Sequence, residues 1–152
     1  MDSNLHNFIF NPGAWMGEGR ILLNMVEEEL SFLTNWNILG KDFAGKVQCL
    51  QEIQINGISE NMKNDIYFYD FGPRTFCVEM DSPNIGRVVG TGVHDDKVIA
   101  WEFRENDMNF EGYETYHLQP DGSYVMQAEY VTTDQFRTLI DGKIWQQKQE
   151  KS

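Results

Sequence analysis

Alternation of apolar and polar residues, broken at short intervals, is the feature that most limits how this chain can fold. Along most of its 152 residues, apolar side chains recur at every second position, which is the period of a β-strand with one buried face. The breaks fall at turn-forming residues such as Asn56-Gly57, Asp121-Gly122 and Asp141-Gly142. Most segments between the breaks are about 8 to 12 residues long, a spacing typical of β-sandwiches and up-and-down barrels.

The pattern predicts ten strands that follow one another through short connections. Adjacent antiparallel strands need only a hairpin between them, so this arrangement favours a meander. Closure into a barrel removes the two free edges that an open sheet would leave. We therefore predict an all-β fold, with residues 1–152 as a single lipocalin-like up-and-down antiparallel barrel and Asp2–Phe10 as a short N-terminal helical plug. The predicted strands are Ala14–Asn24, Glu28–Leu39, Lys46–Asn56, Asp65–Phe71, Thr75–Asp81, Ile85–His94, Lys97–Glu105, Met108–Leu118, Ser123–Thr132 and Gln135–Trp145.

The first predicted strand opens with Gly13-Ala14-Trp15-Met16-Gly17-Glu18-Gly19. Alternate side chains of a strand point the same way, so Trp15 shares its face with Gly17 and Gly19. A large ring followed by two absent side chains is typical of a bent strand whose backbone closely approaches a neighbour or a ligand. We predict that Trp15 caps one end of the barrel.

These residues also carry a family resemblance. Gly-x-Trp on a first strand resembles the hallmark of the lipocalins and the wider calycin superfamily. The longer form, Gly-x-Trp-x-Gly-x-Gly at residues 13–19, is similar to the opening of the nitrobindin-type ten-stranded barrels. The resemblance implies an internal pocket for a small, mainly apolar ligand, with haem as one such ligand.

Haem in the nitrobindin-type proteins is held by a histidine near the C-terminal end of the barrel, and the predicted last strand here has none. The chain's histidines are His6, His94 and His117, which we interpret as surface or structural residues, with His117 kept as the alternative iron ligand. We therefore predict no cofactor and no metal. The Arg-x-Tyr pair of intracellular fatty-acid carriers is also missing, since Thr138 and Leu139 follow Arg137.

Charge and chain composition narrow the partners and the compartment. The net charge is −12, with no run of basic residues, which argues against nucleic acid and against anionic membrane surfaces. No apolar run approaches the roughly 20 residues of a membrane helix, and the N-terminus has no secretion signal, so the prediction is a cytoplasmic protein. Cys49 and Cys77 are interpreted as reduced, buried thiols, with one bridge between them left open. A homodimer is also left open.

Candidate ligand-binding residues come from the more apolar face of each predicted strand. Arg87 alternates with Ile85 and Val89, which makes it the best candidate for an inward cation. Glu79 and Glu102 are candidate cavity carboxylates for proton transfer. Other residues expected to point inward are Leu30, Phe32, Val47, Ile53, Ile99, Phe103 and Met126. The predicted ligand-binding residues are Trp15, Trp36, Gln51, Arg87, Trp101, Tyr116 and Tyr130.

The chain carries no nucleophile elbow, dinucleotide fingerprint or HExxH motif. The glycine-rich stretch Gly86–Gly92 lies within a strand pattern without a following helix, so it lacks the helix terminus of a phosphate site. The first hypothesis is an intracellular binding protein that holds a small apolar or amphipathic molecule. The alternatives are a barrel enzyme (a decarboxylase, isomerase or bilin lyase) using inward Arg, Tyr and Glu, and an interaction domain whose interior is filled by its own side chains.

Overall fold

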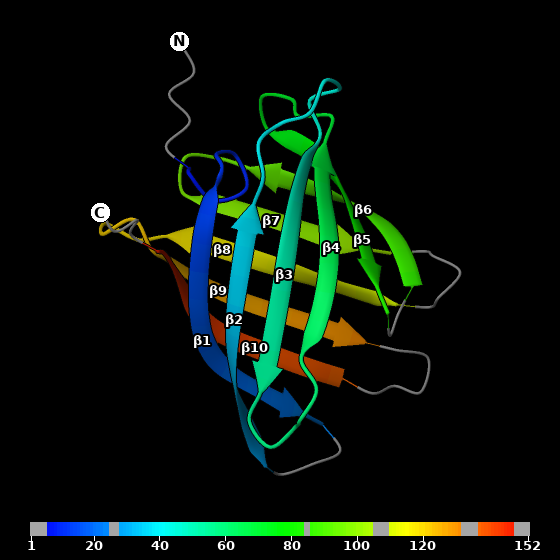
Figure 1. Ribbon diagram of the computed structural model, residues 1–152. Helices are drawn as coiled ribbons and strands as arrows, with labels where there is room; N and C mark the ends of the chain where they lie inside the picture. Colours follow the sequence, from blue (N-terminus) through cyan, green and yellow to red (C-terminus); the bar gives the residue numbers. More distant parts are fainter. Residues whose placement is uncertain (1–5, 25–27, 84–85, 105–109, 132–136, 148–152) are drawn as a thin grey trace.

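The chain forms a closed barrel of ten antiparallel strands (Figure 1). The computed structural model describes residues 6–24, 28–83, 86–104, 110–131 and 137–147. Each strand pairs with its neighbours in sequence, and β1 pairs with β10 to close the ring. The predicted closed meander is therefore confirmed. The strands are β1 (Gly13–Leu23), β2 (Glu29–Ile38), β3 (Val47–Ile55), β4 (Met62–Tyr69), β5 (Thr75–Ser82), β6 (Gly86–His94), β7 (Val98–Phe103), β8 (Glu111–Leu118), β9 (Tyr124–Val131) and β10 (Arg137–Gln146).

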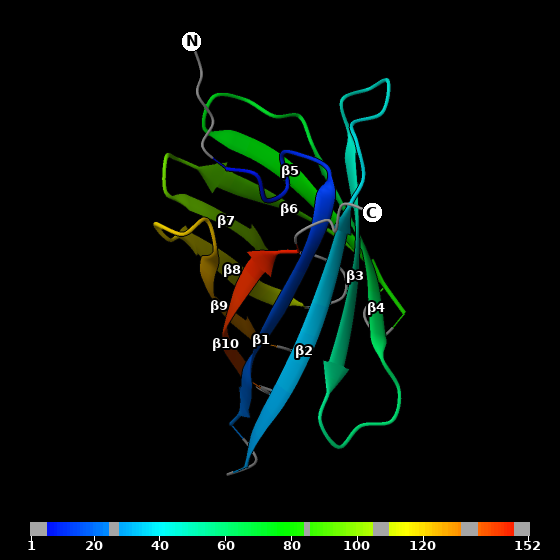
Figure 2. The same ribbon diagram turned by 60° about the vertical axis from the view of Figure 1, so that its left-hand side comes forward.

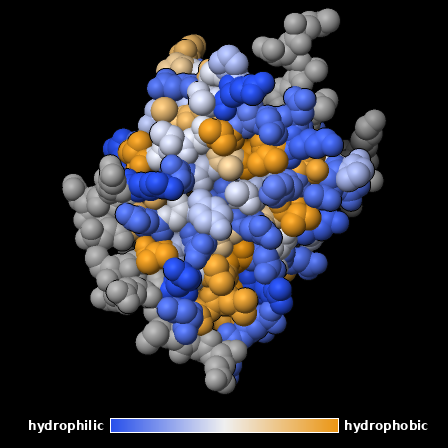
Figure 3. Space-filling model, turned by 180° about the vertical axis from the view of Figure 1, so that it is seen from behind, coloured by the Kyte–Doolittle hydropathy of each residue, from blue (hydrophilic) through white to orange (hydrophobic). Residues whose placement is uncertain are grey.

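The two faces of the sheet follow the alternation in the sequence. On β2, Phe32, Thr34, Trp36 and Ile38 are buried, and the residues between them are exposed. The face of the molecule seen in Figure 3 is largely polar, with apolar patches between polar side chains. Apart from Arg87 and the two candidate cavity carboxylates, Glu79 and Glu102, the residues predicted to point inward are buried in the core or line the internal cavity.

The N-terminal segment closes one end of the barrel without forming a helix. Phe8 and Ile9 are fully buried against the core, but residues 8–10 form a turn in which the Asn11 amide donates to the Asn7 carbonyl. Ile9 adopts a φ of 62°, which a right-handed helix does not permit. The predicted helical plug at Asp2–Phe10 is therefore wrong for its described part, and residues 1–5 lie outside the described residues. Within the described ranges, no helix has the length and apolarity that a membrane span requires.

Barrel closure depends on a close approach between β1 and β10, which run side by side in Figure 2. Gly19 lies opposite Gly142 in the register. A Cβ atom on Gly19 would lie 2.2 Å from the Asp141 carbonyl oxygen, so a side chain there would force the two strands apart. The predicted close approach of the first strand to a neighbour is confirmed. Trp15 is buried at the closed end, where its ring contacts Phe8 and Tyr124.

Candidate functional site

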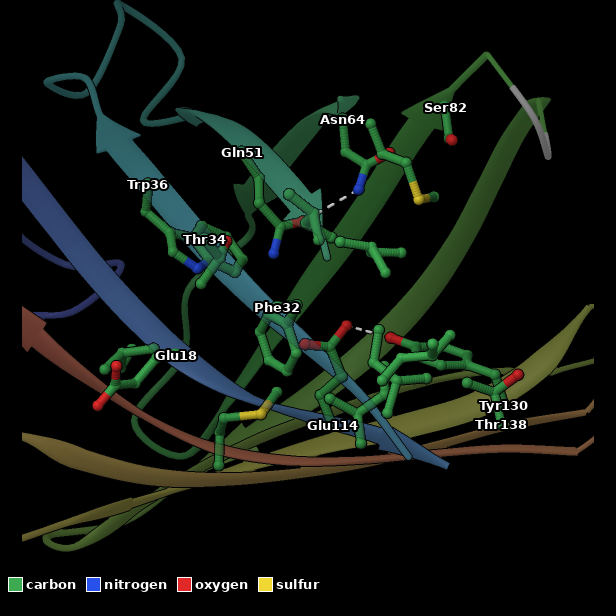
Figure 4. A pocket seen from close by; sticks show the side chains of 18 of the residues that line it. Glu18, Phe32, Thr34, Trp36, Gln51, Asn64, Ser82, Glu114, Tyr130 and Thr138 are labelled. Atoms are coloured by element: carbon green, nitrogen blue, oxygen red, sulfur yellow. Dashed lines mark hydrogen bonds between the residues drawn. The ribbon is translucent and has the colours of Figure 1, made fainter. Parts of the chain in front are cut away.

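A cavity of about 340 Å³ lies inside the barrel, on the side away from the N-terminal segment. Its volume falls at the lower end of the range of small-molecule sites, about 300–1,000 Å³. Most of the lining is aliphatic or aromatic, with a few polar side chains among it (Figure 4). Residues at the strand ends form the rim: Leu23, Leu30, Ile55, Met62 and Thr138.

Aromatic packing explains why the cavity occupies only one half of the barrel. At the closed end, the Phe8 ring lies 4.9–5.6 Å from the rings of Trp15, Trp36, Tyr116 and Tyr124. These rings fill the interior there, since aromatic side chains carry the largest apolar volumes. Trp36 and Tyr116 also line the cavity and so form its floor.

Glu114 is the buried carboxylate among the described residues of the cavity wall, whereas Glu18, which also borders the cavity, is exposed. It lies on β8, is only 9% exposed, and borders the cavity. The Tyr116 hydroxyl donates to its Oε1 at 2.6 Å, and the Tyr130 hydroxyl donates to its Oε2. Each carboxylate oxygen can accept more than one hydrogen bond, so Glu114 keeps acceptor capacity for a group in the cavity.

Burial and hydrogen bonding act in opposite directions on the Glu114 carboxyl. Burial raises its pKa, and the hydrogen bonds from Tyr116, Tyr130 and Trp101 lower it, with burial the larger effect. Burial also raises the pKa of Tyr116 and of Tyr130, as does the neighbouring Glu114 charge. A carboxyl group with a raised pKa and two fixed hydroxyl partners is able to bind a donor or exchange a proton.

A second polar group lies on β3, β4 and β5. The Asn64 amide nitrogen donates to Gln51 Oε1 at 3.0 Å, and both residues line the cavity together with Ser82. Asn64 is 8% exposed and Ser82 is 2% exposed. Asn64 Oδ1 and Ser82 Oγ are buried and have no hydrogen-bond partner among the described residues. Figure 4 shows this group across the cavity from Glu114 and Tyr130.

The structure places the predicted site residues in three groups. Trp36, Gln51, Tyr116 and Tyr130 line the cavity. Trp15 and Trp101 are buried in the aromatic core below it. Arg87 does neither, because it is on the outer face. The ligand-binding roles of the first two groups stay predictions.

The prediction that Arg87 points inward is wrong. Its side chain is 67% exposed, and its guanidinium lies 2.7 Å from Glu79 Oε1. The inner face of β6 carries Val88, Gly90 and Gly92 instead. Gly92 is required there because a Cβ atom would lie 2.2 Å from the Phe76 ring. Neighbouring aromatic rings thus fill the interior beside the glycines of β6, and Val89 and Val93 lie on its outer face.

The two candidate cavity carboxylates are also misplaced. Glu79 lies between the inward Val78 and Met80, and it pairs with Arg87 outside the cavity. Glu102 is 42% exposed and pairs with Arg104. Glu114 was missed, although it lies two residues before Tyr116 and so shares its inward face. The alternation of side chains on β8 therefore indicated that Glu114 points inward, but the prediction was based on apolar residues alone.

The histidines and cysteines lie outside the cavity lining. His117 is exposed on β8, so its role as an iron ligand inside the barrel is wrong. His6 is buried at the closed end, where its Nε2 donates to the Asp95 carbonyl at 2.6 Å. His94 Nε2 lies 3.2 Å from the Gly72 carbonyl oxygen. Cys49 and Cys77 are free thiols without a bridge between them.

This fold and cavity define a lipocalin-like ten-stranded barrel. No protein-family description and no curated protein matches the sequence. Among solved structures, the barrel is similar to the S-type phycobiliprotein lyase CPES from Guillardia theta. The TM-score is 0.68 at 9% sequence identity, over 92% of this chain and 90% of that chain. The likeness concerns the fold.

Proposed function

We propose that this chain is a binding protein that holds one small, largely apolar molecule in the barrel, with a nitrogen-bearing head group on Glu114. The observation that carries the proposal is a buried carboxylate, fixed by two tyrosine hydroxyls, in the wall of a largely apolar cavity. A few placed polar groups in an apolar pocket are what orients a bound ligand. An N–H donor or an ammonium group complements the free acceptor capacity of Glu114.

A carboxylate ligand is disfavoured by the same arrangement. It would bring a like charge to Glu114. Lys143, the one cation among the described lining residues, is half exposed and lies 3.8 Å from Asp121 on the outer surface. Arg87 is engaged outside the cavity. The missing Arg-x-Tyr pair in the sequence points the same way.

The test compares decylamine with decanoate, which share an apolar chain and differ in the head group. Binding is followed by tryptophan fluorescence, since Trp36 lines the cavity, and by calorimetry. Decylamine is expected to bind and decanoate to bind far more weakly. Glu114→Gln keeps the shape and removes the charge, and it should weaken decylamine by about 10- to 100-fold, as expected for a charge-assisted hydrogen bond.

Glu102→Gln is the matched control, because it makes the same change on an exposed outer carboxylate, and it should leave the affinity unchanged. The proposal is rejected if decylamine fails to bind, or if it binds the Glu114→Gln variant as tightly as the unaltered protein.

Bilin handling is the second candidate, because the fold is similar to that of a phycobiliprotein lyase. The pyrrole and lactam N–H groups of a bilin would donate to Glu114 in the same way as an amine. Titration with biliverdin tests this candidate, with a red-shifted and intensified absorption band expected on binding. Glu114→Gln should reduce that spectral change. An unaltered biliverdin spectrum at saturating protein would exclude it.

A further inference from the structure

Asn64 and Ser82 each carry, in the cavity wall, one polar atom without a hydrogen-bond partner in the part of the chain that the structure describes. The register that pairs Asp65 with Asp81 places these two residues opposite each other, one position further along β4 and β5. Directly opposite side chains on one face have Cβ atoms about 4.5–5.5 Å apart. Both residues line the cavity, and Asn64 Oδ1 and Ser82 Oγ are buried in its wall.

We infer that Asn64 and Ser82 form a second polar subsite, which binds a hydroxyl group at the far end of the ligand. Asn64 Oδ1 can only accept a hydrogen bond, because an amide oxygen carries no hydrogen, and the amide nitrogen of Asn64 donates to Gln51. Ser82 Oγ can donate one. A hydroxyl group both donates and accepts, so it satisfies the two atoms at once.

The contrast with the other polar groups of the cavity supports a ligand role. Thr34, also buried and in the cavity lining, donates its hydroxyl to the Glu52 carbonyl at 3.0 Å. Glu114 accepts from two tyrosines. Buried polar groups are nearly always hydrogen-bonded, and an orphaned one lowers stability. Orphans that line a cavity are the kind of atoms a bound molecule would satisfy.

This inference rests on the proposed function and deepens it, because it defines both ends of the ligand. Glu114 binds a nitrogen-bearing head, and Asn64 and Ser82 bind a hydroxyl across the cavity. The ligand class is therefore an amphipathic amino alcohol with an apolar middle.

The experiment measures binding of 10-amino-1-decanol and of decylamine, with 6- and 8-carbon amino alcohols to match the span of the cavity. Ser82→Ala removes one orphan, and Asn64→Leu removes the other. Thr34→Val is the control, since it removes a lining hydroxyl that is already bonded to the chain. Urea unfolding of each free variant shows whether it folds.

Ser82→Ala is expected to weaken the best-fitting amino alcohol by about three- to tenfold, and Asn64→Leu by a similar factor. Neither change should alter the affinity for decylamine. Free Ser82→Ala should be at least as stable as the unaltered protein, because it loses an unsatisfied group. Thr34→Val should preserve the ratio between the two ligands.

Three results would overturn the inference. Equal loss of amino alcohol and decylamine affinity would show that Ser82 and Asn64 shape the cavity without hydrogen-bonding a ligand hydroxyl. Unchanged affinity for both ligands in both variants would show that no hydroxyl reaches the subsite. Failure of decylamine itself to bind would reject the proposed function and this inference with it, which separates the two failures.

Discussion

Gly112 is the position where packing and the candidate site depend on one missing side chain. It lies opposite Tyr130 in the register between β8 and β9. A Cβ atom there would lie 2.2 Å from Tyr130 Cδ1 and 2.5 Å from the Glu129 carbonyl oxygen, whereas ordinary contacts lie at 3.4–4 Å. The tyrosine ring crosses over the glycine, and this position brings its hydroxyl to Glu114 Oε2.

Gly112→Ala is therefore expected to move the Tyr130 ring and to strain the β8–β9 pairing. The ring can rotate away, but the Glu129 carbonyl belongs to the backbone and moves only with the strand. Overpacking of this kind lowers the free energy of unfolding by about 1–3 kcal/mol. The lower conformational entropy of the unfolded alanine variant raises it by about 0.4–1 kcal/mol. We expect a net loss of about 1–2 kcal/mol, or roughly 3–6 °C in Tm for a chain of this size.

Urea unfolding followed by tryptophan fluorescence measures the change. Gly40→Ala is the control, because its Cβ would lie 3.8 Å from the nearest atom, on Pro12, and it should be neutral or slightly stabilising. A second readout is decylamine affinity, which should fall as the Tyr130 hydroxyl leaves Glu114. If the Gly112→Ala and Gly40→Ala proteins unfold at the same urea concentration, the reasoning about ring placement is wrong.

Three further predictions use other parts of the barrel. Because burial raises the pKa of Glu114 above its ordinary value of 4.5, the folded protein holds this proton more tightly than the unfolded chain. Its stability should therefore fall, relative to Glu114→Gln, as pH rises from about 4.5 through the folded pKa; parallel urea midpoints across this range would contradict it. Phe8→Ala should cost about 3–5 kcal/mol in urea unfolding, because the ring is fully buried among four aromatic neighbours; a loss below about 1 kcal/mol would show that the N-terminal segment does not seal the barrel. Burial raises the pKa of the Cys49 thiol, so a thiol reagent should label the partly exposed Cys77 in the native protein and both cysteines in urea; rapid native labelling of two thiols would count against the buried position of Cys49.

The head-group preference and the pH effect are linked through one group. An ammonium ligand binds the ionised form of Glu114, so decylamine affinity should strengthen as pH rises through the raised pKa. The Glu114→Gln variant should show no such rise below the pKa of the amine itself. This separates a ligand role for Glu114 from a purely structural one, which would change stability alone.

The alternating pattern determined the strand count, the meander and the inner face of most strands. A strand of period two has one choice of buried face, and turn residues set most strand ends, so local information largely suffices. The exception is Asp141-Gly142, which lies within β10. The glycines of β1 were also readable, since a strand that lacks side chains beside a tryptophan is built for close approach. The confirmed inward positions, such as Trp36 and Tyr116, follow from these rules.

Only the tertiary structure decided which glycines leave space for the aromatic rings of neighbouring strands. On β6 two of the inward positions are Gly90 and Gly92, because the Phe103 and Phe76 rings of the adjacent strands occupy the space beside them. Hydrophobicity therefore placed Arg87 on the wrong face. The conformation of the N-terminal segment also depends on contacts that are distant in sequence, since a turn there packs Phe8 against distant strands. The environment of Glu114 was also decided by the tertiary structure. Its hydrogen-bond partners lie on β8 and β9, and its low exposure depends on the whole closed barrel.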